Sequence, residues 1–429
     1  MEELANNETF KGYMFFWSGQ LFSLLGSMVV FFAINFWIAF VYNDAIISAF
    51  ASFLGVLTMT ICMPFAGVLA DRVNRKILIL VADSLQAYVT ILLIIIFNFG
   101  MANIWIIYIF ISLRSVFQAF HVPTVNAIIP TMVPKDKLSR INGVNFLFTG
   151  VVQLLAPVIG ALMLLFLSVN MIFWIDIITF FIALIPLLSI SIPSVRQINY
   201  SDQKKARSSF FKDFRLGLKT LKIIPGLVVM VILSMLLNFL IQPINSLMTL
   251  FIVDVHGGGP GHLALAEITF TGGMITGAII TSVKKNWKNK IRAIFISLVI
   301  ALLGYMTFAI APIGNYYIMG IGGAILGFNL PIINALYQTF LQTTVPLDKL
   351  GRVTSIDHTL SSSISPVGSL LAGPMALLIG IPSLFFFSGF LGVVCTICFW
   401  TFTGIRKIDI DSKSEKFCDI CRRQLTSVH

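Results

Sequence analysis

The chain has 429 residues, of which 57% are hydrophobic and only 11% are charged, and its 39 Phe greatly outnumber its 9 Tyr. A soluble fold of this length carries about a quarter charged residues and cannot hide so much apolar surface from water, so the composition excludes an ordinary soluble protein. The net charge of +11 would suit nucleic acid by its sign alone, and the placement of the basic residues decides that point.

Apolar segments recur along the whole chain at the length of membrane-spanning helices. A helix needs about 20 apolar residues to cross a bilayer, and several segments are longer, so we expect tilt or kinks. The first segment follows Glu2, Glu3 and Glu8 rather than a basic leader, so we expect no cleaved targeting segment. The sequence predicts an all-α membrane protein with twelve transmembrane helices, over 12–41, 46–70, 77–98, 103–131, 141–167, 170–192, 226–253, 264–283, 292–312, 315–344, 353–379 and 381–404.

The basic residues lie on one side of this arrangement. Of the 29 Lys and Arg residues, 28 fall in segments on the side of the N-terminus, and the remaining one, Arg114, lies inside the fourth span. Cytoplasmic loops of membrane proteins carry such an excess of positive charge. We therefore expect both termini to be cytoplasmic in a multi-pass plasma-membrane protein. The charge then contacts anionic lipid rather than nucleic acid.

Two stretches of the sequence return in the same order more than 200 residues later. Val133-Pro-Lys-Asp-Lys-Leu-Ser-Arg140 returns as Val345-Pro-Leu-Asp-Lys-Leu-Gly-Arg352, and Pro123-Thr-Val-Asn126 returns as Pro331-Ile-Ile-Asn334. Such repetition indicates two related halves of six spans each. We expect an N-terminal six-helix bundle over 1–193, a cytoplasmic linker over 194–225, a C-terminal six-helix bundle over 226–404 and a cytoplasmic tail over 405–429.

A charged motif joins the second and third predicted spans, Gly67-Val-Leu-Ala-Asp71-Arg72-Val-Asn-Arg75-Lys76. Glycine lets two helices approach closely, and Asp can cap the next helix or pair with an Arg of a neighbour. Such a charged latch can break and reform as two halves rock. An ordinary basic loop would explain the Arg and Lys residues but not the Gly-x-x-x-Asp spacing. We expect gating from Gly67, Asp71, Arg72, Arg75 and Lys76.

This motif resembles the cytoplasmic signature loop of the major facilitator superfamily. The stretches Leu113–Ala127, Glu267–Met274 and Gly351–Ser355 resemble the macrolide-efflux type branch of its multidrug exporters. In the fifth span, Gly143, Pro157 and Gly160 resemble the antiporter signature of the superfamily. The resemblance covers nearly the whole chain. It implies a monomeric secondary transporter that exports drugs or toxic amphiphiles by alternating access, driven by an ion gradient that is usually of protons.

One arginine and three acids lie well inside predicted spans. Arg114 is about 16 Å into the fourth span, where insertion scales assign a cost of about 2.5–3.5 kcal/mol. It must therefore face protein, water or a carboxylate. The resemblance implies a role in proton transfer or gating, and a static ion pair is the alternative. Asp83, Asp176 and Asp357 are the candidate proton carriers, and each also suits a helix cap or brace.

Polar residues repeat at helical spacing in three predicted spans. Gln20, Ser23 and Ser27 share one face of the first span. Amides that face lipid are costly, so these faces point inward, towards either a substrate pathway or neighbouring helices. We expect substrate contacts from Gln20 and from two further stripes, Asn238, Gln242 and Asn245 in the seventh span, and Asn334 and Gln338 in the tenth.

The sequence contains no catalytic triad spacing, metal box or cofactor loop, so we expect neither an enzyme nor a cofactor. Cys418-Asp-Ile-Cys421 with His429 lacks the second ligand pair that structural zinc needs. The expected partners are a small amphiphilic substrate, a proton or other coupling ion and membrane lipid. A transporter of a specific metabolite or siderophore and a lysolipid translocator remain alternatives.

Overall fold

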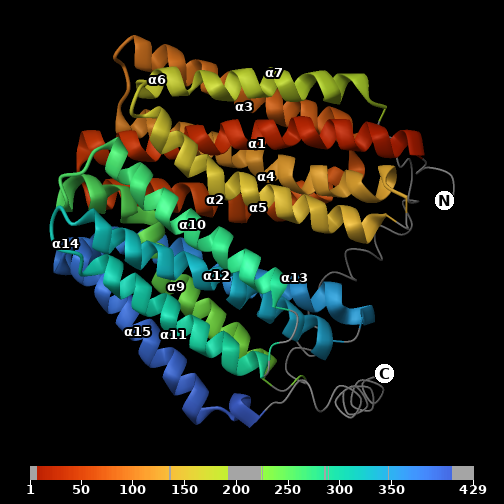
Figure 1. Cartoon of the computed structure of the whole chain (residues 1–429). Coiled ribbons are helices and arrows are strands. Elements are labelled where there is room, and N and C mark those ends of the chain that lie inside the picture. The colour runs from red at the N-terminus through yellow and green to blue at the C-terminus, as the bar shows by residue number, and fades with distance from the viewer. Residues whose placement is uncertain are drawn as a thin grey trace. The chain divides into compact units, whose positions relative to one another are not determined.

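The computed structural model describes residues 7–134, 137–191, 224, 226–284, 287, 289–345 and 347–407, and all regular structure among them is helical (Figure 1). The chain divides into two compact units. Unit 1 comprises Met1–Arg196 and Thr249–Glu267, and unit 2 comprises Gln197–Met248 and Ile268–His429. Eleven of the described helices are long and apolar enough to cross a membrane, and Leu147–Met163 is a shorter apolar helix. The predicted all-α membrane fold with twelve spans is confirmed.

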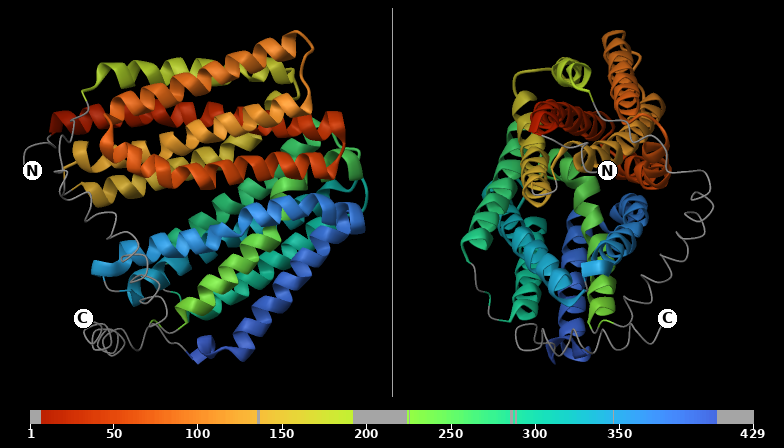
Figure 2. Two further views of the ribbon diagram at one scale, coloured as in Figure 1. Left: turned by 180° about the vertical axis from the view of Figure 1, so that it is seen from behind. Right: turned by 90° about the vertical axis from the view of Figure 1, so that its right-hand side faces the viewer.

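The first half of the chain holds seven helices. They are α1 (Asn7–Tyr42), α2 (Ala45–Arg72), α3 (Arg75–Asn98), α4 (Ile104–Met132), α5 (Leu138–Met163), α6 (Val169–Ile172) and α7 (Trp174–Ser189). Helix α1 packs on α5 and α7, and α4 packs on α2 and α3 (Figures 1 and 2). The predicted sixth span is thus a short helix followed by a longer one. Phe173 separates the two.

The second half follows the same plan with more interruptions. Its helices are α9 (Leu227–Leu250), η1 (Phe251–Val255), α10 (Pro260–Val283), α11 (Lys290–Ala309), α12 (Tyr316–Thr344), α13 (Leu347–Ser363), α14 (Ser365–Ile379), α15 (Ile381–Phe402) and η2 (Gly404–Lys407). The predicted eleventh span is divided at Ile364, because Pro366 has no N–H to continue a helix and suits the first turn of α14.

Short polar side chains start several helices. Asp44 accepts hydrogen bonds from the N–H groups of Ile46 and Ile47 at 2.7 and 3.0 Å, which caps α2. Asn74, Asn103, Asn289 and Asn315 cap the first turns of α3, α4, α11 and α12 in the same way. Each cap satisfies backbone donors that the first turn of a helix leaves without a partner.

Glycines allow close helix packing in both units. In unit 1, a Cβ atom on Gly26 of α1 would lie 2.0 Å from Thr179 Oγ1 of α7. In unit 2, a Cβ atom on Gly322 of α12 would lie 2.4 Å from the backbone nitrogen of Phe308 in α11. Small residues let helix backbones touch in hydrocarbon, where no hydrophobic effect drives them together.

Unit 1 contains two apolar clusters with polar side chains between them. The first cluster includes Val30, Ile34, Leu93, Ile107 and Ile111, and the second includes Phe16, Trp17, Ile79, Ile128 and Met132. On α1, α3 and α4 the sequence between these clusters carries the residues that we call the polar belt: Gln20, Ser27, Asp83, Gln86, Thr90, Arg114 and His121.

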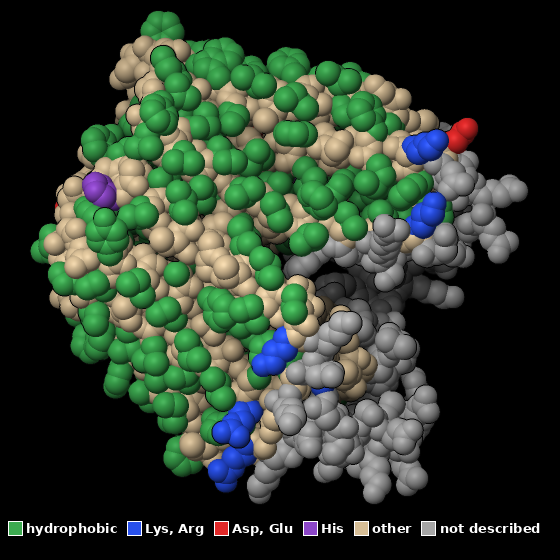
Figure 3. All heavy atoms as spheres, viewed as in Figure 1, with side chains coloured by type: hydrophobic (Ala, Val, Ile, Leu, Met, Phe, Trp, Pro, Cys, Tyr) green, Lys and Arg blue, Asp and Glu red, His purple; other side chains and the backbone are tan. Residues whose placement is uncertain are grey.

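The face shown in Figure 3 is covered mainly by hydrophobic side chains, with Lys and Arg gathered towards helix ends.

The close contact between α11 and α12 can be tested by adding a single methyl group to a glycine. Gly322→Ala places a Cβ atom against the backbone of α11, whereas Gly272→Ala in α10 adds the same atom where nothing lies within 4 Å. We expect Gly322→Ala to be about 1–3 kcal/mol less stable than Gly272→Ala. The measurement is the apparent melting temperature of each purified variant in detergent. Equal melting temperatures would contradict the close approach.

Candidate functional site

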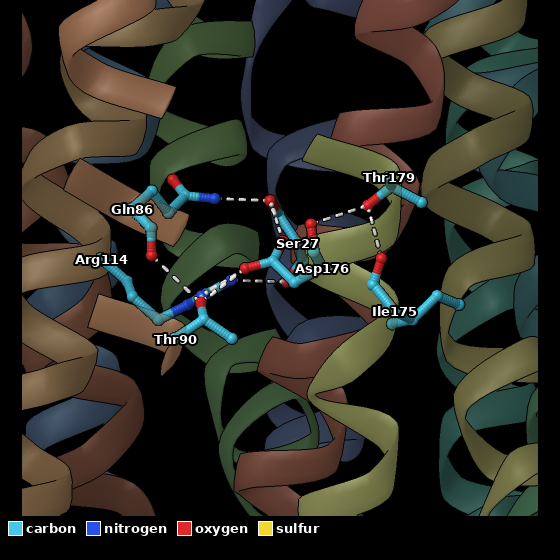
Figure 4. A network of polar contacts seen from close by, with 7 residues as sticks. All are labelled: Ser27, Gln86, Thr90, Arg114, Ile175, Asp176 and Thr179. Carbon is cyan, nitrogen blue, oxygen red and sulfur yellow. Dashed lines mark hydrogen bonds and ion pairs between the residues drawn. The ribbon is translucent and has the colours of Figure 1, made fainter. Parts of the chain in front are cut away.

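A buried ion pair joins two helices of unit 1. Arg114 Nη1 of α4 lies 2.7 Å from Asp176 Oδ2, in the first turn of α7 (Figure 4). The two side chains are only 8% and 5% exposed. Since an isolated charge is costly in hydrocarbon, the carboxylate is the partner that makes an arginine possible at this depth.

Neutral side chains satisfy the remaining atoms of the pair. Thr90 of α3 donates to Asp176 Oδ2 at 2.6 Å, and Ser27 of α1 donates to Asp176 Oδ1 at 2.9 Å. Arg114 also donates to Thr90 Oγ1, and the Gln86 amide donates to Ser27 Oγ. Four helices, α1, α3, α4 and α7, therefore meet at one carboxylate (Figure 4).

Local packing brings α7 to this point. Thr179 donates to the backbone oxygens of Ile175 and Asp176, at 2.7 and 3.1 Å, so its hydroxyl stays within its own helix. Gly26 of α1 lies against that turn, because any Cβ there would meet Thr179 and the Cα of Asp176. The close α1–α7 contact is what places Ser27 within reach of the carboxylate.

A second polar group lies two helical turns along α4 from Arg114. His121 Nε2 lies 2.7 Å from Gln20 Oε1 of α1 and 3.4 Å from Asp83 Oδ1 of α3. Gln20 is only 4% exposed. The contact expected between Gln20 and substrate stays a prediction, and the structure places this amide against a histidine.

The basic end of the predicted latch holds helix ends together. Arg75 donates to the backbone oxygen of Ala127 at 2.7 Å, and Lys76 donates to those of Leu188 and Ile190 at 2.9 and 2.6 Å. Cations suit these carbonyl groups at helix C-termini. The surroundings of Gly67 and the side chains of Asp71 and Arg72, towards the end of α2, lie outside the described part of the chain. The latch itself stays a prediction.

The antiporter-like motif lies on α5. A Cβ atom on Gly160 would be 2.7 Å from the ring of Phe32 in α1, so this glycine allows α5 and α1 to approach. Pro157 is inside the helix, one turn earlier. Gly143 is in the same helix, in the portion whose side-chain environment the structure does not describe.

The amide stripes of unit 2 divide into buried and exposed members. Gln242 of α9 is buried and accepts from Ser369 of α14 at 3.2 Å. Asn238, which is half-buried, donates to the backbone oxygen of Ser234 within its own helix. Asn245 and Asn334 are exposed, and Gln338 is half-buried. The exposed amides are the ones available to water or a ligand.

Two further carboxyl groups lie in spans of the second half. Asp357 of α13 is 3% exposed and accepts a hydrogen bond of 2.6 Å from the Tyr337 hydroxyl of α12. Glu267 of α10 is half-buried, and the sequence interpretation did not count it as an intramembrane acid. The predicted span began at residue 264, whereas α10 begins at Pro260, so Glu267 lies in the third turn rather than at the edge.

Sequence reasoning missed Gln86, Thr90 and His121 as site residues. Asp83, Gln86 and Thr90 recur at i, i+3 and i+7 on α3, which is the same signal that identified the amide stripes. No group of three or more His, Cys, Asp or Glu residues that could hold a metal ion lies in the described ranges. Cys418, Cys421 and His429 lie outside those ranges.

The chain is similar to known transporters over most of its length. The family model described as the Major Facilitator Superfamily matches residues 16–369. Macrolide efflux protein A of Streptococcus pyogenes is 28% identical over 409 residues, covering 95% of this chain and all of that protein. The Staphyloferrin A transporter of Staphylococcus aureus is 23% identical over 412 residues, covering 93% of this chain and 98% of that protein.

The fold is also that of solved transporters. A D-xylose-proton symporter structure matches with a TM-score of 0.67 at 12% identity, covering 91% of this chain and 98% of that one. At this identity the likeness concerns the fold alone. Together with the family match across most of the residues, it shows that the chain belongs to the major facilitator superfamily.

Proposed function

We propose that the protein is a secondary active transporter that exports lipophilic drugs or related amphiphiles by alternating access, in exchange for protons. The observation that carries this proposal is the similarity to Macrolide efflux protein A, which extends over 95% of the chain. A similarity of that extent includes both halves, and alternating access requires both.

The exposed amides of unit 2 support an amphiphilic substrate. Asn245 and Asn334 lie inside membrane-spanning helices and are exposed. An amide that faces hydrocarbon leaves its hydrogen bonds unmade, so these groups favour a water-accessible surface. A few amides among Phe and Met side chains suit a bulky, mostly apolar ligand that forms few directed hydrogen bonds.

The ion pair of unit 1 supports gating. A fully satisfied charge network has one stable arrangement, and separating its members requires water or another partner to enter. We propose that Arg114 and Asp176 are paired in one access state and separate in the other. Asp83 and Asp357 stand as the other candidate coupling groups, and Asp71 with Arg72 as the candidate latch.

We also propose the cellular setting. The protein acts as a monomer in the plasma membrane, with both termini cytoplasmic and the basic helix ends against anionic lipid. Within the long spans, the described Lys and Arg residues other than Arg114 lie near helix ends. This placement of the basic residues favours a single orientation in the membrane.

A specific siderophore exporter is the second candidate. Its support is the similarity to the Staphyloferrin A transporter over 93% of the chain. The two candidates differ in substrate chemistry, because a siderophore of the carboxylate type is anionic and polar, whereas a macrolide is large, apolar and basic.

The proposed activity can be measured in proteoliposomes that contain the purified protein. We expect labelled erythromycin or ethidium to exchange with unlabelled compound, and an imposed pH gradient to accelerate net transport several-fold. Empty liposomes are the control. Exchange of citrate-based siderophores but not of erythromycin or ethidium would favour the second candidate. Lysolipid movement without any ion gradient would favour a lipid translocator.

The role of the ion pair can be separated from its contribution to folding. Arg114→Ala leaves the Asp176 carboxylate buried and unpaired, so we expect a loss of about 3–5 kcal/mol of stability and little folded protein. The double variant Arg114→Gln, Asp176→Asn replaces both charged groups by neutral amides. We expect it to yield folded protein that exchanges erythromycin at least tenfold more slowly than the unaltered protein.

Asn98→Ala is the matched control, because it removes an exposed hydrogen bond from Asn170 in the same unit. We expect its stability to change by less than about 0.5 kcal/mol and its transport rate to be unaltered. Full transport activity in the neutral double variant would show that the pair is a static brace. Size-exclusion chromatography and exchange rates report folding and transport separately.

A further inference from the structure

We propose that Asp83 and His121, held by Gln20, form the site that binds and releases the transported proton, an inference that rests on the proposed proton antiport. The three residues come from α3, α4 and α1, which are the helices that also carry Thr90, Arg114 and Ser27. The site is therefore built on three of the four helices that meet at the ion pair, but at a different depth.

The geometry around His121 favours proton exchange. Its Nε2 atom faces two acceptors at once, Gln20 Oε1 at 2.7 Å and Asp83 Oδ1 at 3.4 Å. A proton on Nε2 is bonded to Gln20 in this arrangement, and a small rotation of the imidazole would redirect it to Asp83. A carboxylate and an imidazole that share one proton are neutral together, whereas the deprotonated pair carries one negative charge.

The Gln20 side chain indicates that the site can bind a further group besides Asp83 and His121. Its side chain is 4% exposed, its oxygen bonds His121, and its buried amide nitrogen lies beside the Asp83 carboxylate without a hydrogen bond of good geometry. A buried donor without a partner is costly, and exchanging the amide O and N atoms would leave the oxygen unpaired instead. A water bound beside Asp83 and His121 would accept a hydrogen bond from that donor, and a proton can reach the pair through it.

The charged groups around the pair are few and identifiable. Arg114 on α4 and Asp176 on α7 form the neighbouring layer, and Asp176 lies near enough to Asp83 for the two carboxylates to interact. On α1, Tyr13 lies two turns before Gln20 in the second apolar cluster. At the start of α3, Arg75 and Lys76 bind backbone carbonyls. The described side chains of α2 and α5 include no charged group.

In this arrangement, the charge of the Asp83–His121 pair acts on the Arg114–Asp176 ion pair, which is the proposed gate. When the pair is deprotonated, the Asp83 carboxylate repels that of Asp176. When the pair binds a proton it becomes neutral, and the Arg114–Asp176 bond strengthens. One proton enters at the pair in one access state and leaves from it in the other, with no other bond made or broken.

The other buried carboxyl groups fit this role less well. Asp357 accepts a hydrogen bond from Tyr337, whose hydroxyl is a far weaker base than an imidazole at neutral pH. Asp176 is bonded to Arg114, Thr90 and Ser27 at once, so a proton there would cost the whole network. Asp83 and His121 form a direct contact of 3.4 Å between a carboxylate and an imidazole, whereas His358 follows Asp357 in the chain and acts on it through its charge.

The test compares two kinds of transport in proteoliposomes, with labelled erythromycin as the probe. Exchange at equal pH on both sides requires no net proton movement, whereas transport driven by a pH gradient does. We expect Asp83→Asn and His121→Gln to retain measurable exchange of erythromycin at equal pH on both sides. We also expect the ratio of the rates with and without the gradient to fall to one. Asp83→Glu, which keeps the carboxyl group, is expected to recover part of that ratio.

His262→Gln, in the first turn of α10, is the matched control and is expected to keep the full response to the gradient. A gradient response in Asp83→Asn and His121→Gln equal to that of the unaltered protein would overturn the assignment of the pair while leaving antiport in place. If the unaltered protein exchanges erythromycin but its transport rate does not depend on the pH gradient, the proposed proton antiport is wrong. The assignment of the Asp83–His121 pair then fails with it.

If neither neutral variant yields folded protein, the unaltered protein still decides the matter. Binding of saturating erythromycin in unbuffered detergent solution is expected to release about one proton per protein molecule, detected with an indicator dye. Release of no proton between about pH 5 and pH 8 would overturn the proposal.

Discussion

A positive charge in the middle of a membrane helix is the constraint on which unit 1 depends. The Arg114 side chain is only 8% exposed, so the groups around the guanidinium have to be acceptors held at hydrogen-bond distance. Asp176 provides the charge, and Thr90 and Ser27 fill the remaining positions around that carboxylate. The short α6, the turn at the start of α7 and the glycine at position 26 all serve to bring one carboxylate to one arginine.

The two halves solve the same packing problem differently. A shift of 208 residues, which relates Pro123 to Pro331, relates Arg114 to Gly322. Where α4 presents a charged side chain to α3, α12 presents a bare backbone to α11, with Gly304 opposite. Backbone contact between small residues has no alternative partner and forms a rigid joint, whereas a polar joint can exchange its partners for water. The repeat therefore places a rigid contact in one half and a breakable one in the other.

Much of this fold can be predicted from the sequence, because the hydrocarbon core of a bilayer restricts the length of spanning helices and the positions of charged residues. The spans, their number and the family follow from that rule and from the repeated motifs. The partners inside the bundle do not follow, since periodicity gives the face of a helix but not the helix that meets it. Arg114 required a carboxylate, yet nothing in the sequence selected Asp176 among three acids. The stripe of Gln20 and Ser27 was visible, but the structure divides it between His121 and Asp176. Glu267 was missed because Gly-Gly-Pro-Gly reads as a loop, whereas Pro260 is the first residue of α10.

The separation between the proposed proton site and the ion pair sets the strength with which one can influence the other. His121 follows Arg114 by seven residues, which is about 10 Å along α4. At that distance, and at an effective dielectric constant of about 20, one unit charge changes the energy of another by about 1.7 kcal/mol. The opposite charges of Arg114 and Asp176 respond in opposite directions, so the net effect on the ion pair is smaller than this value and less than the several kcal/mol lost when a buried ion pair loses one partner. Protonation can therefore bias the gate without opening it alone, and the remaining free energy has to come from the substrate. A transporter with this division of roles does not leak protons when no substrate is bound, because neither event is sufficient by itself.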